Sequence, residues 1–377
     1  MPQCFALFSG GLDSALAVKT MLLAGVDVIA LNFVSHFFGG PSEKIEQMAK
    51  QLNVPVLFVP FQSLQLAVTA TPKAGRGKNF NACIDCHATM LNIAGKMMSN
   101  YGVDFIVTGE VLGQRPMSQN SQALQQVAKM SGFANFILRP LSAQLLPVPD
   151  FLEKFNLKID QFLSIQGRSS GPQEKLMRQY KLGHPSHGGG CMLTEPIFGN
   201  KMKQLYADQV ICKENQFIYQ CMRKGRLLRW AEAQYIIVGR NEQENMFLDG
   251  FRKYCEYVTA VTPMTEPQQL PGPTILILDF TKIKGKIIEA EEIQIKNDIE
   301  ELQCGECKVC KSLENFQQQD IKFEANEDLK AFAKQAFNYF CKGKGKQDCV
   351  CEFNGELVEV KAIGEGAEKI IREKLLE

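Results

Sequence analysis

The clearest chemical signal in the chain is a short loop rich in glycine and hydroxyl groups. The apolar run Cys4–Phe8 leads into it, a segment with helical spacing follows, and the Walker sequence Gly-Lys-Ser/Thr is absent from it. Glycines let the backbone approach a phosphate, and the amides at a helix start attract an anion. The alternative is a simple glycine turn capped by Asp or Ser. The predicted phosphate-binding residues are Ser9, Gly10, Gly11, Leu12, Asp13 and Ser14, with Asp13 as a Mg²⁺ ligand.

Three cysteines give a second signal. Cys83 and Cys86 form a Cys-x-x-Cys pair before a predicted helix, and Cys191 follows three consecutive glycines. Closely spaced thiolates suit zinc, an iron–sulfur cluster or a redox disulfide. The alternative is that the pair packs as small hydrophobic side chains and that Cys191 is unrelated to it.

The elements that must position these residues alternate between strand and helix patterns. Short apolar runs at Cys4–Phe8, Val26–Phe33 and Val54–Phe61 are separated by segments with helical spacing. Such alternation is typical of a parallel sheet covered on both faces. We therefore expect an α/β fold with a doubly wound parallel sheet over residues 1–196, followed by smaller α+β domains.

The loop resembles the signature of the PP-loop ATP pyrophosphatases, which include the tRNA thiouridylases. Asp104–Glu110 (DFIVTGE) resembles the later family strand, whose Thr-Gly end lies beside the nucleotide. The resemblance implies an adenine nucleotide alpha hydrolase-like fold and cleavage of ATP, with Mg²⁺, into AMP and pyrophosphate. It also implies that Thr108 and Gly109 bind ATP.

The cysteines extend this resemblance to the tRNA 2-thiouridylases. Cys86 resembles the first family cysteine, Cys191 resembles the second, and Cys83 stands where well-known bacterial enzymes have Asp. The set of Cys83, Cys86 and Cys191 instead resembles that of iron–sulfur-dependent tRNA thiolases. This implies three catalytic cysteines that hold a 4Fe–4S cluster with one open iron for hydrosulfide; a cysteine persulfide and zinc remain alternatives.

The middle of the chain is basic. Residues 175–229 contain ten Lys and Arg against three acidic residues, interleaved with aromatic residues. Cations neutralise phosphates and aromatic rings stack on bases, whereas a solvated charged face is the alternative. Parts of residues 215–280 resemble the NFACT RNA-binding module, which defines an expected domain at 197–285. The expected RNA-binding residues are Arg115, Arg226, Arg229 and Arg240.

The last part of the chain, 286–377, is predicted to be an α/β segment with its own cysteines. The sequence Cys-x-x-Cys-x-x-Cys occurs at Cys304, Cys307 and Cys310. This spacing is similar to the start of ferredoxin clusters, so a second iron–sulfur or zinc site is expected, with Cys341, Cys349 or Cys351 as a fourth ligand. Free thiols in an acidic linker are the alternative.

Composition limits the cellular setting. The 377 residues include 13 cysteines, too few for a disulfide scaffold, and the net charge is +1, which excludes a basic nucleic-acid binder at whole-chain level. No run of about 18 apolar residues occurs, so we expect no membrane partner. These features predict a protein of the reducing cytoplasm.

Together these features predict an ATP-dependent tRNA sulfurtransferase. The expected partners are tRNA and either sulfide or a cysteine desulfurase or sulfur carrier, because no rhodanese-like cysteine loop is present in the sequence. One alternative is a PP-loop ligase or sulfur transferase acting on a small molecule. Another is a non-catalytic RNA-binding protein whose loop senses nucleotide.

Overall fold

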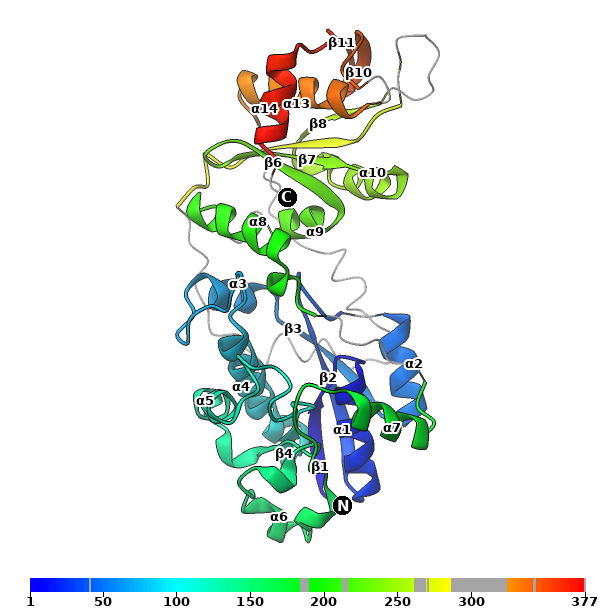
Figure 1. The fold of residues 1–377 in the computed structure, drawn as a ribbon, viewed down its shortest axis with the longest axis vertical. Coiled ribbons are helices and arrows are strands. Elements are labelled where there is room, and N and C mark those ends of the chain that lie inside the picture. Colours follow the sequence, from blue (N-terminus) through cyan, green and yellow to red (C-terminus); the bar gives the residue numbers. More distant parts are fainter. Residues whose placement is uncertain are drawn as a thin grey trace. The chain divides into compact units, whose positions relative to one another are not determined.

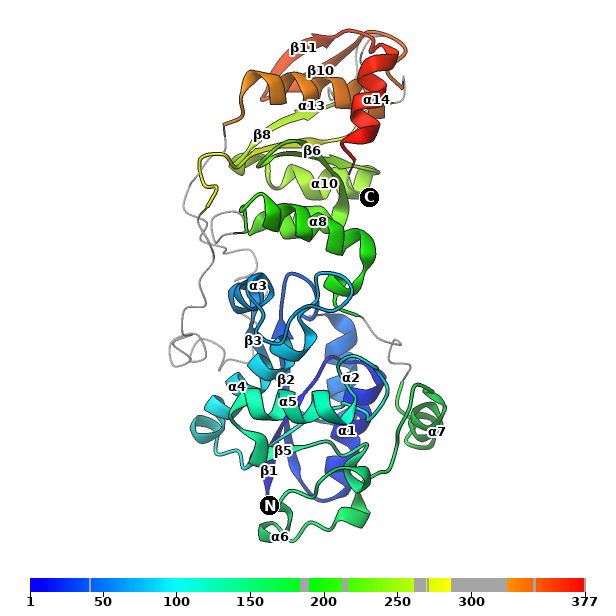
Figure 2. The same cartoon turned by 60° about the vertical axis from the view of Figure 1, so that its left-hand side comes forward.

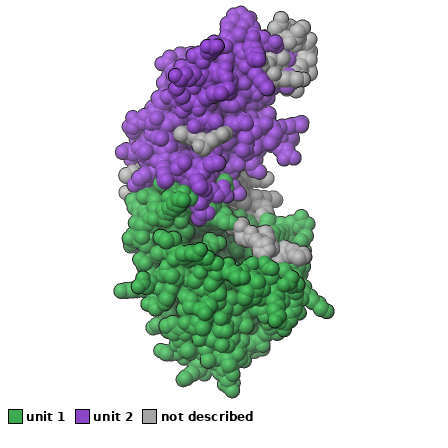
Figure 3. All heavy atoms as spheres, in the orientation of Figure 1, with its two compact units in different colours: residues 1–192, 289–316 green, residues 193–288, 317–377 purple. Residues whose placement is uncertain are grey.

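The computed structural model describes residues 1–40, 42–183, 190–211, 216–260, 269, 271–285, 324–341 and 344–375. They form two compact units, shown in different colours in Figure 3, with the change from the first to the second at residues 192 and 193. Within these ranges, no helix is long and apolar enough to cross a membrane.

The first unit is built on a parallel sheet of five strands, which confirms the predicted fold class (Figure 1). The strands lie in the order β3-β2-β1-β4-β5. Their bounds are β1 (Gln3–Leu7), β2 (Asp27–Val34), β3 (Val56–Pro60), β4 (Phe105–Val107) and β5 (Ile137–Leu138). The strands are mainly apolar, as burial on both faces requires.

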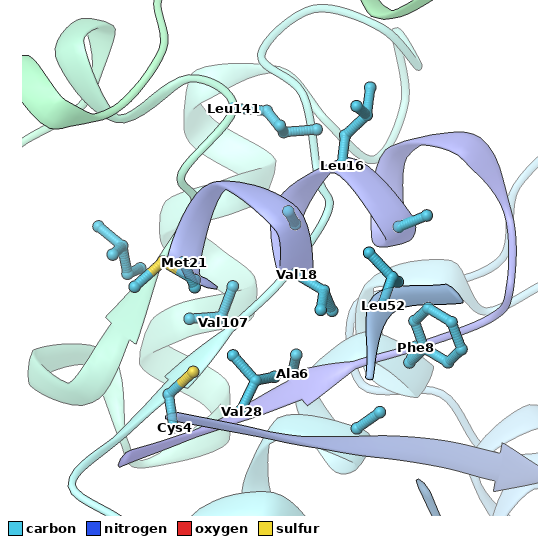
Figure 4. Packing of buried hydrophobic residues seen from close by; sticks show 14 of the residues in the cluster. Cys4, Ala6, Phe8, Leu16, Val18, Met21, Val28, Leu52, Val107 and Leu141 are labelled. Atoms are coloured by element: carbon cyan, nitrogen blue, oxygen red, sulfur yellow. The ribbon is translucent and has the colours of Figure 1, made fainter. Parts of the chain in front are cut away.

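Helices cover both faces of this sheet. They are α1 (Leu12–Leu23), α2 (Glu43–Leu52), α3 (Gln62–Ala70), α4 (Cys83–Tyr101), α5 (Ser121–Ser131), α6 (Phe151–Lys154) and α7 (Gly171–Gln179). Alternate residues of β1 point to opposite faces: Cys4 and Ala6 pack in the core under α1, whereas Phe5 packs in the core under α4. Figure 4 shows the first of these cores, with Leu16, Val18 and Met21 of α1 over the strands.

The second unit contains an antiparallel sheet of six strands in the order β11-β10-β8-β9-β7-β6. The strands are β6 (Gly225–Ala231), β7 (Gln234–Gly239), β8 (Glu256–Thr259), β9 (Ile275–Asp279), β10 (Cys349–Phe353) and β11 (Glu356–Val360). Its helices are α8 (Pro196–Ala207), α9 (Phe217–Lys224), α10 (Glu242–Asp249), α13 (Glu327–Phe340) and α14 (Glu365–Glu373). The β10–β11 hairpin turns at Asn354 and Gly355, both with positive φ, as the Asn-Gly pair predicts.

Helix α13 covers one face of the second sheet, and α10 lies on the other (Figure 2). Leu329, Phe332 and Phe337 of α13 pack against Ile236, Ile277 and other buried strand residues. Strands from both expected segments, 197–285 and 286–377, therefore share one sheet and one core. The division of the chain into three functional modules stays a prediction.

Candidate active site

The strand order of the first unit creates a crevice for a ligand. From β1 the chain proceeds to β2 and β3 on one side, whereas β4 and β5 lie on the other side of β1. In open α/β sheets, ligands bind at such a switch point, beyond the carboxyl ends of the strands. The glycine loop follows β1 and Thr108 follows β4, so both predicted ATP-binding segments lie at this point.

The glycine loop has the backbone shape that a phosphate site needs. Gly10 has φ +69°, in the left-handed region, and Gly11 is the N-cap of α1 without a side-chain cap. The amides of the first turn thus have no capping side chain, and they carry the positive end of the helix dipole. Ser14 Oγ donates to Gly11 O at 3.0 Å and lies 3.3 Å from Ser9 Oγ.

Asp13 joins the glycine loop to the segment after β4. Its Oδ2 accepts a hydrogen bond from Gln114 Nε2 at 3.0 Å. Its Oδ1 is buried and has no hydrogen-bond partner among the described residues. A buried carboxylate oxygen without a donor is costly, and it fits a cation ligand that binds together with the phosphates.

Gly109 is required by the close approach of two backbones. A Cβ at this position would lie 2.7 Å from both Asp13 C and Ser14 N. Any other residue would push the segment after β4 away from the start of α1. The Thr-Gly pair therefore packs directly on the predicted phosphate loop.

The next residue, Glu110, is the centre of a buried ionic cluster. Its carboxylate accepts from Arg139 Nε at 2.9 Å and from the Thr108 hydroxyl at 3.1 Å, and it lies 2.8 Å from His87 Nδ1. Burial alone would raise the pKa of Glu110, but the Arg139 charge and the His87 hydrogen bond outweigh it and lower that pKa to about 2. Since His87 follows Cys86 directly, this cluster ties the cysteine helix α4 to the segment beside the glycine loop.

Cys86 and Cys191, 105 positions apart, share one neighbour. The side-chain amide nitrogen of Gln65, on α3, lies 4.0 Å from each of their sulfur atoms. Cys86 is 6 % exposed and Cys191 is half-buried. Burial raises the pKa of the Cys86 thiol well above its usual range, and the nearby Cys191 and Cys83 raise it further. The structure thus brings the three predicted cysteines together.

The loop before Cys83 is held by the residue between the two cysteines of the pair. Asp85 is 5 % exposed, and its carboxylate accepts from the backbone N–H groups of Lys73 and Ala74 at 2.7 and 3.0 Å. Asn81 Nδ2 lies 3.2 Å from Cys83 Sγ. The Cys-Ile-Asp-Cys sequence therefore fixes its own entry loop as well as presenting two thiols.

Neither of the two predicted metal sites is seen as a ligand cluster among the described residues. Within the described part of the chain, no three Cys, His, Asp or Glu side chains are gathered so that they could hold a metal ion. Cys83, Cys86 and Cys191 as arranged, with an amide against two of the sulfurs, do not fit one metal ion, and the iron–sulfur cluster stays a prediction. Cys304, Cys307 and Cys310 lie outside the described residues.

Three described cysteines of the second unit, each expected as a possible fourth metal ligand, are core residues. Cys341, Cys349 and Cys351 are each 2 % exposed or less and pack with α13 in the apolar core. Cys4 in the first unit and Cys221 and Cys255 in the second are also completely buried and serve as packing residues.

The predicted RNA-binding arginines differ in the contacts that their side chains make within the protein. Arg229 makes a two-pronged ion pair with the buried Asp208, at 2.8 and 2.9 Å, and Tyr235 also donates to that carboxylate. Arg240 pairs with Glu244 at 2.6 Å, and Arg226 lies over the ring of Phe340. Arg115 is exposed, next to the residue that binds Asp13. Their roles toward RNA stay predictions.

Sequence reasoning missed Gln65 and Arg139. Each is a polar residue in an otherwise ordinary element, and its partner is remote in the sequence: 126 positions for Gln65 and Cys191, and 29 for Arg139 and Glu110. The one local signal for Gln65 is its place on the buried face of α3, beside Leu66 and Thr69.

Comparison with known proteins supports the first unit's assignment. Residues 2–144 match the family described as thiamine biosynthesis protein (ThiI). The chain is 31% identical over 139 residues to a probable tRNA sulfurtransferase of Finegoldia magna, covering 36% of this chain and 35% of that protein. It is 32% identical over 146 residues to one of Methanobrevibacter smithii, covering 36% of each. The matched part thus spans about a third of these relatives.

A solved structure, a 4-thiouridine synthetase–RNA complex with bound ATP, is similar at 19% identity and a TM-score of 0.36, over 58% of this chain and 52% of that one. That likeness is too weak to support an argument about function. The sequence matches confirm the resemblance to tRNA thiouridylases of the PP-loop type for residues 2–144, whereas the NFACT resemblance stays a prediction.

Proposed function

We propose that this protein catalyses the ATP-dependent thiolation of a uridine in tRNA. The observation that carries the proposal is the connection, within one unit, of a phosphate loop to a pair of sulfurs. Gly109 packs on Asp13, Glu110 forms a hydrogen bond with His87, and Cys86 directly precedes His87. The similarity of the first unit to proteins named tRNA sulfurtransferase supports the same reading.

The loop would bind the phosphates of ATP. Backbone amides from Gly10 to Ser14 would hold pyrophosphate, and the unpartnered Oδ1 of Asp13 would bind Mg²⁺. A uracil carbonyl oxygen attacks the α-phosphorus, the bond to the β-phosphate breaks, and pyrophosphate leaves. The oxygen then departs with AMP when sulfur replaces it, so this step converts a poor leaving group into a good one.

Cys191 and Cys86 would carry the sulfur. A persulfide on the more accessible Cys191 attacks the activated uracil carbon and expels AMP. The Cys86 thiolate then attacks the Cys191 sulfur, which releases thiouridine and leaves a Cys86–Cys191 disulfide. Hydrosulfide opens this disulfide to a new Cys191 persulfide and a Cys86 thiol, so the cycle balances with sulfide as the only sulfur reactant.

The Gln65 contacts support the persulfide route. Amide N–H groups stabilise anionic sulfur, and both sulfurs lie at hydrogen-bond distance from the same nitrogen. The iron–sulfur route uses the same cysteines, with Cys83, as ligands. Iron analysis of anaerobically purified protein separates the two routes, because the persulfide route predicts full activity without iron and the cluster route predicts none.

The tRNA would approach the exposed Arg115 near the nucleotide and the basic residues of the second unit. We propose that residues 1–196 form the catalytic module, that residues 197–285 contribute RNA binding through Arg226 and Arg240, and that residues 286–377 form a further module. The ion pair with Asp208 makes Arg229 the weakest of these candidates for phosphate binding.

The decisive first test is pyrophosphate release. Purified protein with ATP and Mg²⁺ should release pyrophosphate rapidly only when unmodified tRNA is added. Release with no dependence on tRNA would favour a small-molecule substrate, a second candidate that the description of the matching family as a thiamine biosynthesis protein supports. No release under any condition would leave a nucleotide-sensing protein.

A further inference from the structure

The fully buried amide of Gln65 lies against the sulfur atoms of Cys86 and Cys191 in the first unit. Gln65 is 0 % exposed and lies on α3. Cys86 is the fourth residue of α4, and Cys191 lies 105 positions further along the chain. The Gln65 nitrogen has two hydrogens and has two sulfur atoms within 4.0 Å. One side chain can therefore donate one hydrogen bond to each sulfur.

The orientation of this amide is fixed from its other end. The Ser35 hydroxyl donates to Gln65 Oε1, and its oxygen accepts from the Phe37 N–H at 2.9 Å. Since the hydroxyl oxygen is occupied by a backbone donor, its proton is available for the amide oxygen. The NH₂ group is thereby left facing the sulfurs.

The same short segment also anchors the second cysteine. The Phe37 carbonyl accepts from the N–H of Met192, the residue after Cys191, at 3.2 Å. Ser35 and Phe37 thus hold both the amide and the chain beside Cys191. The hydrogen bonds of Ser35 and Phe37 therefore fix the Cys86 and Cys191 sulfurs relative to each other.

A donor is needed here because burial disfavours charged sulfur. Burial raises the pKa of Cys86, and the other ionisable groups that act on it, Cys191, Cys83 and Asp85, raise it too. The Gln65 hydrogen bond acts in the opposite direction. Removing that bond would therefore leave the thiolate form of Cys86 harder to reach.

We propose that Gln65 is the positioning residue of the sulfur transfer, holding Cys86 and Cys191 together through one amide hydrogen bond to each sulfur. The inference rests on the proposed function. In the step that it assists, the bond between the Cys191 sulfur and the outer sulfur breaks and the Cys86–Cys191 bond forms. The electron pair leaves with the outer sulfur on uracil, and the Cys86 proton goes to solvent.

The test uses cysteine reactivity, which needs neither ATP nor tRNA. In the full-length protein, we compare Gln65→Leu and Gln65→Glu with the matched control Gln125→Leu, on the exposed face of α5. The readouts are the rate of Cys86–Cys191 disulfide formation with diamide, and the pH profile of Cys86 alkylation by iodoacetamide, followed by peptide mass spectrometry. We expect at least about tenfold slower disulfide formation in both Gln65 variants.

Gln65→Glu should also shift the alkylation profile of Cys86 to higher pH, because a carboxylate replaces the donor. Ser35→Ala keeps the amide and removes the bond that orients it, together with the bond from the Phe37 N–H. It should therefore show a smaller effect in the same direction, and it provides a test if Gln65→Leu does not fold. Wild-type reactivity in the folded Gln65 variants would overturn the inference.

Thiolation assays separate the inference from the proposed function. If tRNA is thiolated, the Gln65 variants should lower kcat with little change in the KM for tRNA. If tRNA is never thiolated but the reactivity shifts occur, the amide aligns the two sulfurs and only the proposed substrate is wrong.

Discussion

Cys86 in the first unit and Cys351 in the second are both buried, but among different neighbours. In the first unit, Cys86 has an amide donor against its sulfur, and Cys191 shares that donor. In the second unit, Cys349 and Cys351 are fully buried in an apolar core beneath α13. Burial raises the pKa of the Cys86 and Cys351 thiols, and it outweighs the Lys334 charge beside Cys351. The difference lies in geometry, because one amide nitrogen lies against the sulfurs of both Cys86 and Cys191. The shared amide donor, more than the cysteine spacing, distinguishes the pair that we propose to react.

The largest expected effect comes from replacing one cysteine in each unit and comparing the thiolation rates. Cys191→Ser removes the atom that would carry sulfur, so we expect the thiolation rate to fall at least about 1000-fold. Cys351→Ala should leave the rate of the folded protein unchanged and lower its stability by about 1 kcal/mol, through lost packing. Initial rates and thermal melts measure both. A similar loss of rate in the two variants would erase the distinction.

The buried carboxylate of Glu110 tests whether the first unit's ionic cluster stabilises the fold. Its pKa of about 2 lies below the ordinary 4.5, so the stabilisation is complete above pH 4.5 and is lost as the pH falls toward 2. Glu110→Gln should be less stable at pH 7 by about 3 kcal/mol. Denaturant unfolding at several pH values should show that this difference shrinks on acidification; a constant difference would contradict the assignment.

Asp13 tests whether the glycine loop is built for a ligand. Asp13→Asn removes the charge that would bind Mg²⁺, so pyrophosphate release should fall about 100-fold. Without nucleotide the variant should be at least as stable as the wild type, because Oδ1 has no partner among the described residues. The exposed Asp27→Asn is the control. A variant that is less stable and equally active would make Asp13 structural.

Two arginines of the second unit should respond differently to charge reversal: one through protein stability, the other through tRNA affinity. Arg229→Glu places a carboxylate against the buried Asp208 and should cost about 2 kcal/mol of stability in thermal or denaturant melts. Arg226→Glu should keep the fold and lower the salt dependence of tRNA affinity by about one unit of slope. An unchanged slope would remove Arg226 from the RNA surface.

Local sequence predicted the elements better than their contacts. Apolar residues recur with helical spacing over residues 328–340, where α13 (Glu327–Phe340) forms. The Asn354-Gly355 pair is a local hairpin signal, and the β10–β11 turn forms there. The sequence of residues 135–138 looks like a strand, but only Ile137–Leu138 pairs in the sheet, because Ala134–Phe136 forms a 3₁₀ turn. These features follow from periodicity and turn residues, which act over a few positions.

The sequence predicted some residues of the candidate site and missed others. The glycine loop and the cysteine pair have local spacing, and the sequence therefore predicted them. The Gln65–Ser35 support and the Glu110–Arg139 pair depend on strands brought side by side by the sheet, so no local pattern reports them. The same limit applies to Arg229, which looks like its basic neighbours until Asp208 is seen beside it.

Mass spectrometry of tRNA nucleosides tests the central claim most directly. Purified protein is incubated with unmodified tRNA, ATP, Mg²⁺ and sulfide, and the digested tRNA is compared with that from the Cys191→Ser reaction. The proposed function predicts a thiolated uridine in the wild-type reaction only, with one pyrophosphate released for each. Pyrophosphate release that is stimulated by tRNA without any thiolated nucleoside would contradict it.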